Sequence, residues 1–158
     1  MYHLHESIWI GVEPHLVFQA LSDHEWFLKG PNLNCQLVKY GREQKNGQGA
    51  IRKVVVTRSI FTEKITAFSP VEHYEYKIQS LIDARGRSIP LRHERGWLDF
   101  SAENDGTRVD WHSRYEFSLP IVGNAVEVIV SWRAKKVFAS LLQRAKSELE
   151  INSIIKLK

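Results

Sequence analysis

Asp110, His112 and Ser113 stand close together in the chain, and they are the residue types of a hydrolase triad. The segment follows the tight-turn signal Asp105-Gly106 and then alternates apolar and polar residues, which indicates a half-buried strand. Successive side chains of a strand point to opposite faces, so Ser113 points away from the other two. A nucleophilic serine must lie within hydrogen-bond reach of its base. We therefore interpret this segment as a strand, not as a triad.

Three charged residues lie an even number of positions from apolar residues in predicted strands, so they share a strand face with them. They are therefore candidates for the interior. Arg52, in "GAIRKVV", could enter a cavity and hold a carboxylate, phosphate or enolate oxygen. Glu63 and Glu94 alternate in the same way, and an enclosed glutamate could act as a general acid or base. Each residue also has a non-catalytic interpretation. Arg52 could keep its guanidinium in water, and either glutamate could form a structural ion pair with it.

Aromatic residues of the same inward parity form the predicted wall of that cavity. With Arg52 they make up our candidate ligand-binding residues, which are Tyr74, Tyr76, Trp111, Tyr115, Phe117 and, on the C-terminal helix, Phe138. The functional interpretation is that Tyr76 and Tyr115 turn their hydroxyl groups toward a ligand. The alternative is that all of these rings pack the core, since aromatic residues dominate protein cores.

Histidines are the other residues whose spacing could support chemistry. His3 and His5 share one strand face, and an i, i+2 pair can chelate a metal ion. No matching third ligand is evident in the sequence, so we expect no metal site and no cofactor. His73, His93 and His112 have the opposite parity to the cavity residues and are expected on the exposed face of the sheet.

The amino-acid composition indicates the class of protein to which the chain belongs. The chain has 158 residues, of which 43% are hydrophobic and 25% charged, as in a soluble domain with one core. No apolar run suits a bilayer span and no signal peptide is evident, so we expect a cytoplasmic protein without integral membrane association. Cys35 is the only cysteine, which excludes an internal disulfide and a thiolate metal cluster. The charge of +4 comes from scattered basic residues, which argues against nucleic acid as a partner.

The elements that position these residues follow from hydrophobic periodicity. An alternating strand over 4–12 precedes a helix that starts at Pro14, and the capping pattern at 22–25 starts a second short helix. Asn46-Gly47 and Asp105-Gly106 indicate hairpin turns. Six further runs have strand composition, giving about seven antiparallel strands: 35–41, 50–57, 62–68, 72–80, 91–101 and 107–117.

A long amphipathic helix ends the chain. From about residue 124 to 150, apolar residues at helical spacing form one broad arc, and residues 151–158 either extend the helix or fray. Trp132 falls outside the arc, while Trp9 and Trp97 are assigned to the outer face of the sheet. We therefore predict an α+β fold in which a curved antiparallel sheet wraps around the C-terminal helix. Because one helix does not fill a wide curved sheet, a cavity should remain between them.

This order of elements resembles the START-like, helix-grip superfamily, specifically the polyketide cyclase/dehydrase-type (SRPBCC) proteins, over about residues 3–150 of a single domain spanning 1–158. The resemblance rests on "LSDHEWF", "NGQGAIRKV", "TEKITAFSP", "YEYKI" and above all "GTRVDWHSRYEF". It implies binding of hydrophobic or amphipathic small molecules such as lipids, polyketides or isoprenoids. Some members are cyclases, hydratases or dehydratases, but no family catalytic set matches this sequence residue by residue.

Three functions are therefore open. The first is a protein that encloses a hydrophobic or amphipathic small molecule. The second is a lyase or isomerase of the cyclase/dehydratase type, in which Glu94 or Glu63 carries a proton while Arg52 and Tyr76 stabilise an oxyanion. The third is an interaction module, a homodimer or a membrane-associated protein, that uses exposed tryptophans and the basic back of the helix.

Overall fold

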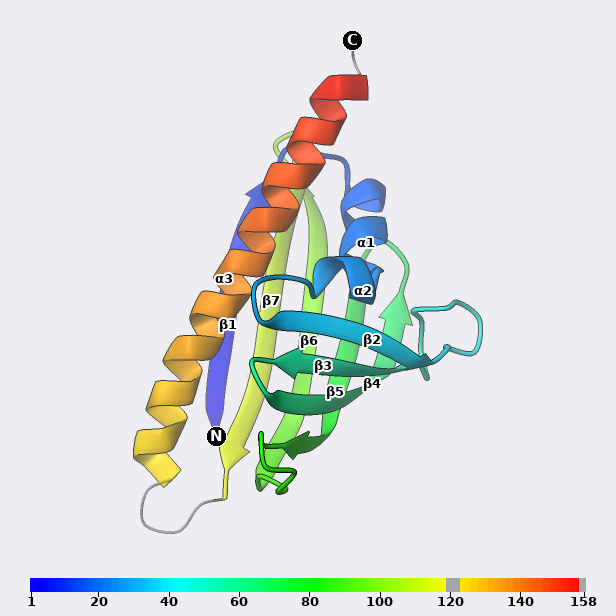
Figure 1. Ribbon diagram of the computed structural model, residues 1–158. Coiled ribbons are helices and arrows are strands. Elements are labelled where there is room, and N and C mark those ends of the chain that lie inside the picture. Colours follow the sequence, from blue (N-terminus) through cyan, green and yellow to red (C-terminus); the bar gives the residue numbers. More distant parts are fainter. Residues whose placement is uncertain (119–122, 157–158) are drawn as a thin grey trace.

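Seven strands form one antiparallel sheet, and one long helix lies across it (Figure 1). The computed structural model describes residues 1–118 and 123–156. The strand order is β1-β7-β6-β5-β4-β3-β2, so β1 and β2 are the two edges. The elements in chain order are β1 (Tyr2–Ile10), α1 (Pro14–Ser22), α2 (His24–Phe27), β2 (Leu33–Lys39), β3 (Ile51–Val56), β4 (Ser59–Ser69), β5 (His73–Ile82), β6 (Leu91–Glu103), β7 (Gly106–Phe117) and α3 (Gly123–Lys156).

The predicted α+β helix-grip class is confirmed. Figure 1 shows β2, β3 and β4 crossing in front of β6 and β7, so the sheet is strongly curved. α3 runs along the open side of this curve, while α1 and α2 cover its other end. Sheet and helix each bury an apolar face against the other, which is how two layers share one core.

Local sequence signals explain where the short helices begin. Pro14 stands in the first turn of α1, where its missing N–H would have no helical partner in any case. The side chain of Asp23 accepts a hydrogen bond from the backbone N–H of Trp26 and so caps α2. Glu25 instead accepts from the backbone N–H of Leu37, which ties α2 to β2.

Two of the predicted turns differ from the structure. At the β6–β7 hairpin the positive φ angles belong to Asn104 and Asp105, while Gly106 already begins β7. Asn46-Gly47 lies within an eleven-residue loop over 40–50 and does not form a two-residue hairpin. The two-residue turn in this part of the chain is Thr57-Arg58, between β3 and β4, where Thr57 has a φ of 58°.

α3 follows the predicted apolar arc. Leu141, Leu142 and Ala145 are buried, whereas Trp132 is 58% exposed, as expected for a residue outside the arc. The helix continues to Lys156, and residues 157–158 lie outside the described residues. No helix among the described residues is both long and apolar enough to cross a membrane.

Beside α1 the core is densely packed with aromatic rings. Phe18 meets Phe68, Tyr74 and Phe100 edge-on, with ring centroids 5.0 to 6.4 Å apart. This cluster of four rings, called here the packed end, fills the space between α1 and the sheet. The space between the sheet and α3 is occupied differently, and it holds the candidate site.

Candidate ligand-binding site

A cavity of about 530 Å³ lies between the inner face of the sheet and α3. Its walls come from β2 to β7, from α3 and from the segment that follows α2. Most of the lining is apolar, which is typical of pockets for small organic molecules. The lining side chains are Leu28, Leu33, Arg52, Val54, Val56, Thr57, Arg58, Ser59, Phe61, Glu63, Tyr76, Ile78, Ala84, Leu91, Trp111, Ser113, Tyr115, Phe117, Val130, Arg133, Ala134, Val137, Phe138 and Leu141.

Most of the residues singled out in the sequence meet at this cavity. Strand parity places those on the sheet there, because they alternate with residues of the outer face, and Phe138 faces them from α3. Six of the candidate ligand-binding residues and one candidate carboxylate line the wall: Arg52, Tyr76, Trp111, Tyr115, Phe117, Phe138 and Glu63.

Tyr74 points inward but does not line the cavity. Its ring belongs to the packed end, and its hydroxyl donates a hydrogen bond to the backbone carbonyl of Leu21 at 3.1 Å. Burial raises the pKa of Tyr74. The expectation that it contacts a ligand together with Tyr76 is therefore wrong in placement, because α1 covers this part of β5.

Glu94 is exposed on the outer face, so its predicted inward orientation is wrong. The register of β6 against β7 shifts between His93 and Arg95, which makes Glu94 the extra residue of a β-bulge. Its carboxylate pairs with Arg114 at 3.8 Å. The same bulge reverses the parity of the strand before it, and the expectation that His93 is exposed is wrong for that reason.

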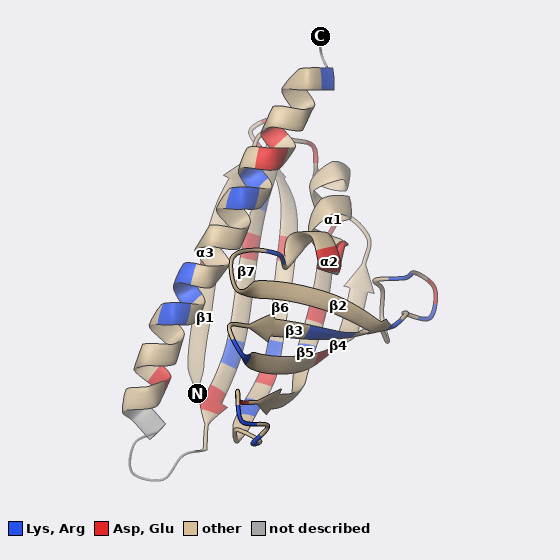
Figure 2. Ribbon diagram, viewed as in Figure 1, with Lys and Arg blue, Asp and Glu red and all other residues tan. Residues whose placement is uncertain are grey.

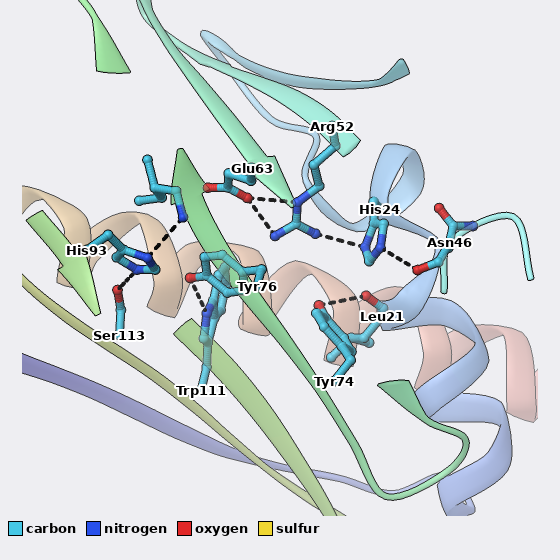
Figure 3. Close-up of polar contacts among 11 residues, drawn as sticks. Leu21, His24, Asn46, Arg52, Glu63, Tyr74, Tyr76, His93, Trp111 and Ser113 are labelled. Carbon is cyan, nitrogen blue, oxygen red and sulfur yellow. Dashed lines mark hydrogen bonds and ion pairs between the residues drawn. The ribbon is translucent and has the colours of Figure 1, made fainter. Parts of the chain in front are cut away.

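His93 is buried and fully bonded. Its Nδ1 accepts from the backbone N–H of Ile78 at 3.0 Å, and its Nε2 donates to the hydroxyl of Ser113 at 3.1 Å (Figure 3). Burial, with a smaller contribution from the charge of Lys77, lowers the pKa of His93 to about 4. The imidazole is therefore neutral at physiological pH. Sequence parity missed this group because the bulge leaves no clear signal in the sequence.

A buried charge network lies at the cavity wall (Figure 3). Arg52 is 1% exposed, and its Nε and one terminal nitrogen both donate to Oε2 of Glu63 at 2.7 Å. The other terminal nitrogen donates to Nδ1 of His24 at 2.8 Å, and Nε2 of His24 donates to the carbonyl of Asn46 at 2.9 Å. Burial and the charge of Arg52 lower the pKa of His24, so its ring is neutral and accepts this bond.

The network favours the structural interpretation of Arg52. Burial alone would lower the pKa of Arg52, but the Glu63 carboxylate outweighs it and the pKa is raised. The guanidinium is thus a charged group whose donors already serve Glu63 and His24. Three of its five N–H groups make these bonds, so an oxyanion could be held only by the remaining two. Within the described residues both hydrogen bonds to Glu63 end on Oε2, which leaves Oε1 available at the cavity wall.

An aromatic stack joins the sheet to α3 on the opposite wall. The rings of Trp111 and Phe138 lie nearly parallel, with centroids 3.6 Å apart. The indole N–H of Trp111 donates to the hydroxyl of Tyr76 at 3.1 Å, so this hydroxyl keeps its own proton for another acceptor. The hydroxyl of Tyr115 donates to Ser131 of α3 at 2.8 Å. Of the two tyrosine hydroxyls expected to face a ligand, only that of Tyr76 has a donor to offer.

Exposed residues mark where the cavity opens. Thr57 and Arg58 of the β3–β4 turn, Ala84 of the β5–β6 connection and Arg133 of α3 line the cavity and are exposed. Two guanidinium groups therefore stand at the opening. Figure 2 shows that basic and acidic bands alternate along α3, and that the loop between β2 and β3 also carries basic residues.

Comparison with known proteins places the chain among similar sequences and folds. A family model described as "Polyketide cyclase / dehydrase and lipid transport" matches residues 1–150. A comparison with curated protein sequences gives no match.

The similar solved structures share the fold at low sequence identity. The protein TTHA0849 from Thermus thermophilus is 18% identical, with a TM-score of 0.71 over 96% of this chain and 99% of that chain. A START superfamily protein from Mycobacterium smegmatis is 12% identical, with a TM-score of 0.71 over 94% and 99%. The Aha1 dimer from Colwellia psychrerythraea is 13% identical, with a TM-score of 0.63 over 96% and 98%.

Proposed function

This chain belongs to the polyketide cyclase/dehydrase and lipid transport family, and on that premise we propose that it binds one hydrophobic or amphipathic small molecule in the cavity beneath α3. The observation that carries the proposal is a largely apolar cavity of about 530 Å³, within the roughly 300–1,000 Å³ that ligand pockets occupy. Burying an apolar ligand there removes its surface from water, which is the main source of binding free energy.

The polar groups of the wall suggest what the ligand carries. Oε1 of Glu63 can accept a hydrogen bond, and the hydroxyl of Tyr76 can donate one. A ligand hydroxyl could use both. Arg58 and Arg133 at the opening favour an acidic or polar group at the other end of the molecule. We propose a hydroxylated amphipathic ligand, such as a lipid, polyketide or isoprenoid.

Two experiments test this function. The purified protein is extracted with organic solvent and the extract is examined by mass spectrometry for a stoichiometric small molecule. Separately, the fluorescent probe ANS is titrated into wild type and two variants of α3. Ala134→Trp fills the cavity, whereas Ala139→Trp places the same ring on the exposed back of the helix.

Wild type and Ala139→Trp should bind the probe alike, and Ala134→Trp should lose at least about tenfold in affinity, or 1.4 kcal/mol. Equal binding by both variants would place the probe elsewhere on the surface. If no ligand were extracted and wild type also failed to bind the probe, the proposal would be contradicted.

Catalysis is the second candidate, favoured by one observation. A carboxylate oxygen and a tyrosine hydroxyl, from Glu63 and Tyr76, are both available at the wall of one cavity. Glu63 would carry the proton, since Glu94 lies outside. Once a ligand is extracted, incubation with wild type and Glu63→Gln decides: turnover by wild type alone supports an enzyme, and an unchanged ligand supports a binding protein. A cytoplasmic location and a homodimer stay predictions of the sequence.

A further inference from the structure

Three histidines and an aspartate gather on the outer face of the sheet, away from the cavity. β1 is an edge strand that pairs antiparallel with β7, and this register sets His5 directly opposite His112. Asp110 stands two residues before His112 and so shares its face. One ligand atom from each of His5, Asp110 and His112 lies within 4.8 Å of the other two.

The contacts inside this cluster hold its nitrogen and oxygen atoms close together. Nε2 of His5 donates to Oδ1 of Asp110 at 2.8 Å, and the rings of His5 and His112 stack with centroids 4.1 Å apart. Nε2 of His3 lies 3.0 Å from Nδ1 of His112, so one proton is shared between two imidazoles. His3 and His5 are exposed, which leaves their rings free to turn.

We propose that His5, Asp110 and His112 bind one divalent transition-metal ion of the Zn²⁺ class, with His3 in reach as a further ligand. Imidazole nitrogens with a carboxylate oxygen suit Zn²⁺, Cu²⁺ or Ni²⁺, whereas Ca²⁺ and Mg²⁺ prefer oxygen ligands alone. Bonds of about 2.1 Å to Zn²⁺ set neighbouring ligand atoms roughly 3.4 Å apart. Nε2 of His5 now lies 2.8 Å from Oδ1 of Asp110, and rotation of the exposed His5 side chain would widen this spacing to that value.

The surroundings support a metal ligand role for Asp110 and His112. Arg108 fixes the carboxylate of Asp110, donating from Nε to Oδ2 at 2.9 Å and from a terminal nitrogen to Oδ1 at 3.3 Å, so the metal would replace the longer of these two bonds at Oδ1. The ring of Trp97 stacks on His112 with centroids 4.6 Å apart and orients the imidazole. Arg114 stacks on the same indole ring, and its positive charge opposes a cation, so we expect micromolar rather than tighter affinity.

The bound ion would hold β1 against β7, and β1 also contacts α3. β1 has only one neighbour in the sheet, and it contacts α3 through the ion pair of Glu6 with Lys135 at 3.6 Å. A ligand that bridges β1 and β7 in the folded chain alone must stabilise the fold by mass action. Metal binding should therefore raise the melting temperature independently of the cavity.

Titration of Zn²⁺ into chelator-treated protein tests the inference by calorimetry, with Co²⁺ absorption as a spectroscopic readout of nitrogen and oxygen coordination. Wild type should bind one ion per chain and gain thermal stability. His112→Gln and Asp110→Asn should each lose about tenfold or more in affinity and show no thermal shift. His73→Gln is the matched control, because His73 also lies on the outer face but pairs with Asp99 on another strand.

Three results would overturn the site. These are no binding by wild type at submillimolar Zn²⁺, unchanged binding by His112→Gln, or an equal loss in the His73→Gln control. The last would mean scattered coordination by surface histidines. Circular dichroism of each variant separates lost ligands from lost folding, and ANS binding reports on the cavity separately.

Discussion

At the scale of single residues, Arg52 links the stability of the fold to the polarity of the cavity. Its guanidinium is buried between Glu63 and His24, and without it Glu63 would lose both of its bonds to Arg52 and Nδ1 of His24 would lose its donor. A buried ion pair adds little net stability compared with apolar residues, but losing one partner is costly. The pair therefore limits which single substitutions this wall tolerates.

Arg52→Met should lower the free energy of unfolding by about 3–5 kcal/mol, because the Glu63 charge stays buried without a counterion. The double variant Arg52→Met/Glu63→Leu removes that charge and should be more stable than Arg52→Met alone, although His24 still lacks its donor. Urea denaturation of all variants measures this. The exposed pair of Arg92 with Glu116 gives the control, and Arg92→Met should stay near wild-type stability. A double variant less stable than Arg52→Met would contradict the argument.

His93 should make the fold sensitive to acid. Its pKa is lowered from 6.5 to about 4 in the folded protein, so between these values the unfolded chain binds the proton and the folded chain does not. Its contribution is full above pH 6.5 and falls as the pH drops toward 4, by roughly 3 kcal/mol in all. His24 acts in the same direction.

The difference between wild type and His93→Asn isolates this effect from the carboxylates. The substituted amide keeps an acceptor for the backbone N–H of Ile78 but cannot be protonated in this range. Urea unfolding at several pH values should show the stability advantage of wild type shrinking from pH 6.5 downward. Two parallel curves would show that His93 does not titrate as argued.

At the scale of elements, β6 shows why the alternation of residues predicts the sheet face of some side chains and not of others. Parity placed Arg52 and Glu63 at the cavity because β3 and β4 pair without a register shift along that stretch. The bulge at Glu94 exchanges the faces of Glu94 and His93. A single extra residue in a strand changes no local propensity, so alternation alone cannot reveal it.

Pairing between distant strands was the other limit. The sequence shows His3 and His5 as an incomplete chelate, whereas the structure sets His112 and Asp110 beside them. These ligands are more than 100 residues away along the chain, and only the strand order and register bring them together. The elements themselves were predictable, because each carries its own periodicity, caps or turn residues.

The close approach of β1 to β7 yields a prediction for the hairpin glycine. A Cβ at Gly106 would overlap the backbone carbonyl oxygen of Ile10, whereas a Cβ at Gly30 meets nothing within 4 Å. Gly106→Ala must displace β1 and should cost about 1–3 kcal/mol of stability, while Gly30→Ala should be nearly neutral. Thermal and urea unfolding measure both. Equal stability of the two variants would show that β1 yields without cost.

At the scale of the whole molecule, the inner face of the sheet covers one filled region and one hollow region. Rings of the packed end fill the space beneath α1, whereas the cavity remains beneath α3. Cavities lower stability because their walls lack van der Waals contacts, so a fold that contains one is less tightly packed than a filled core. A bound ligand returns those contacts, and stability and binding are then coupled.

Substitutions at two adjacent leucines of α3 distinguish the effect of core packing on stability from the effect of the cavity on ligand binding. Leu142 is 1% exposed and lies outside the cavity lining, whereas Leu141 is 5% exposed and lines the cavity. Leu142→Ala should cost about 2–5 kcal/mol and leave ANS affinity unchanged, because it opens a new void in packed core. Leu141→Ala should cost less, since it only enlarges existing space, and should change ANS affinity. If both variants lost the same stability and bound ANS with the same affinity, the space beneath α3 would behave as ordinary core. That result would contradict a ligand-binding cavity beneath α3.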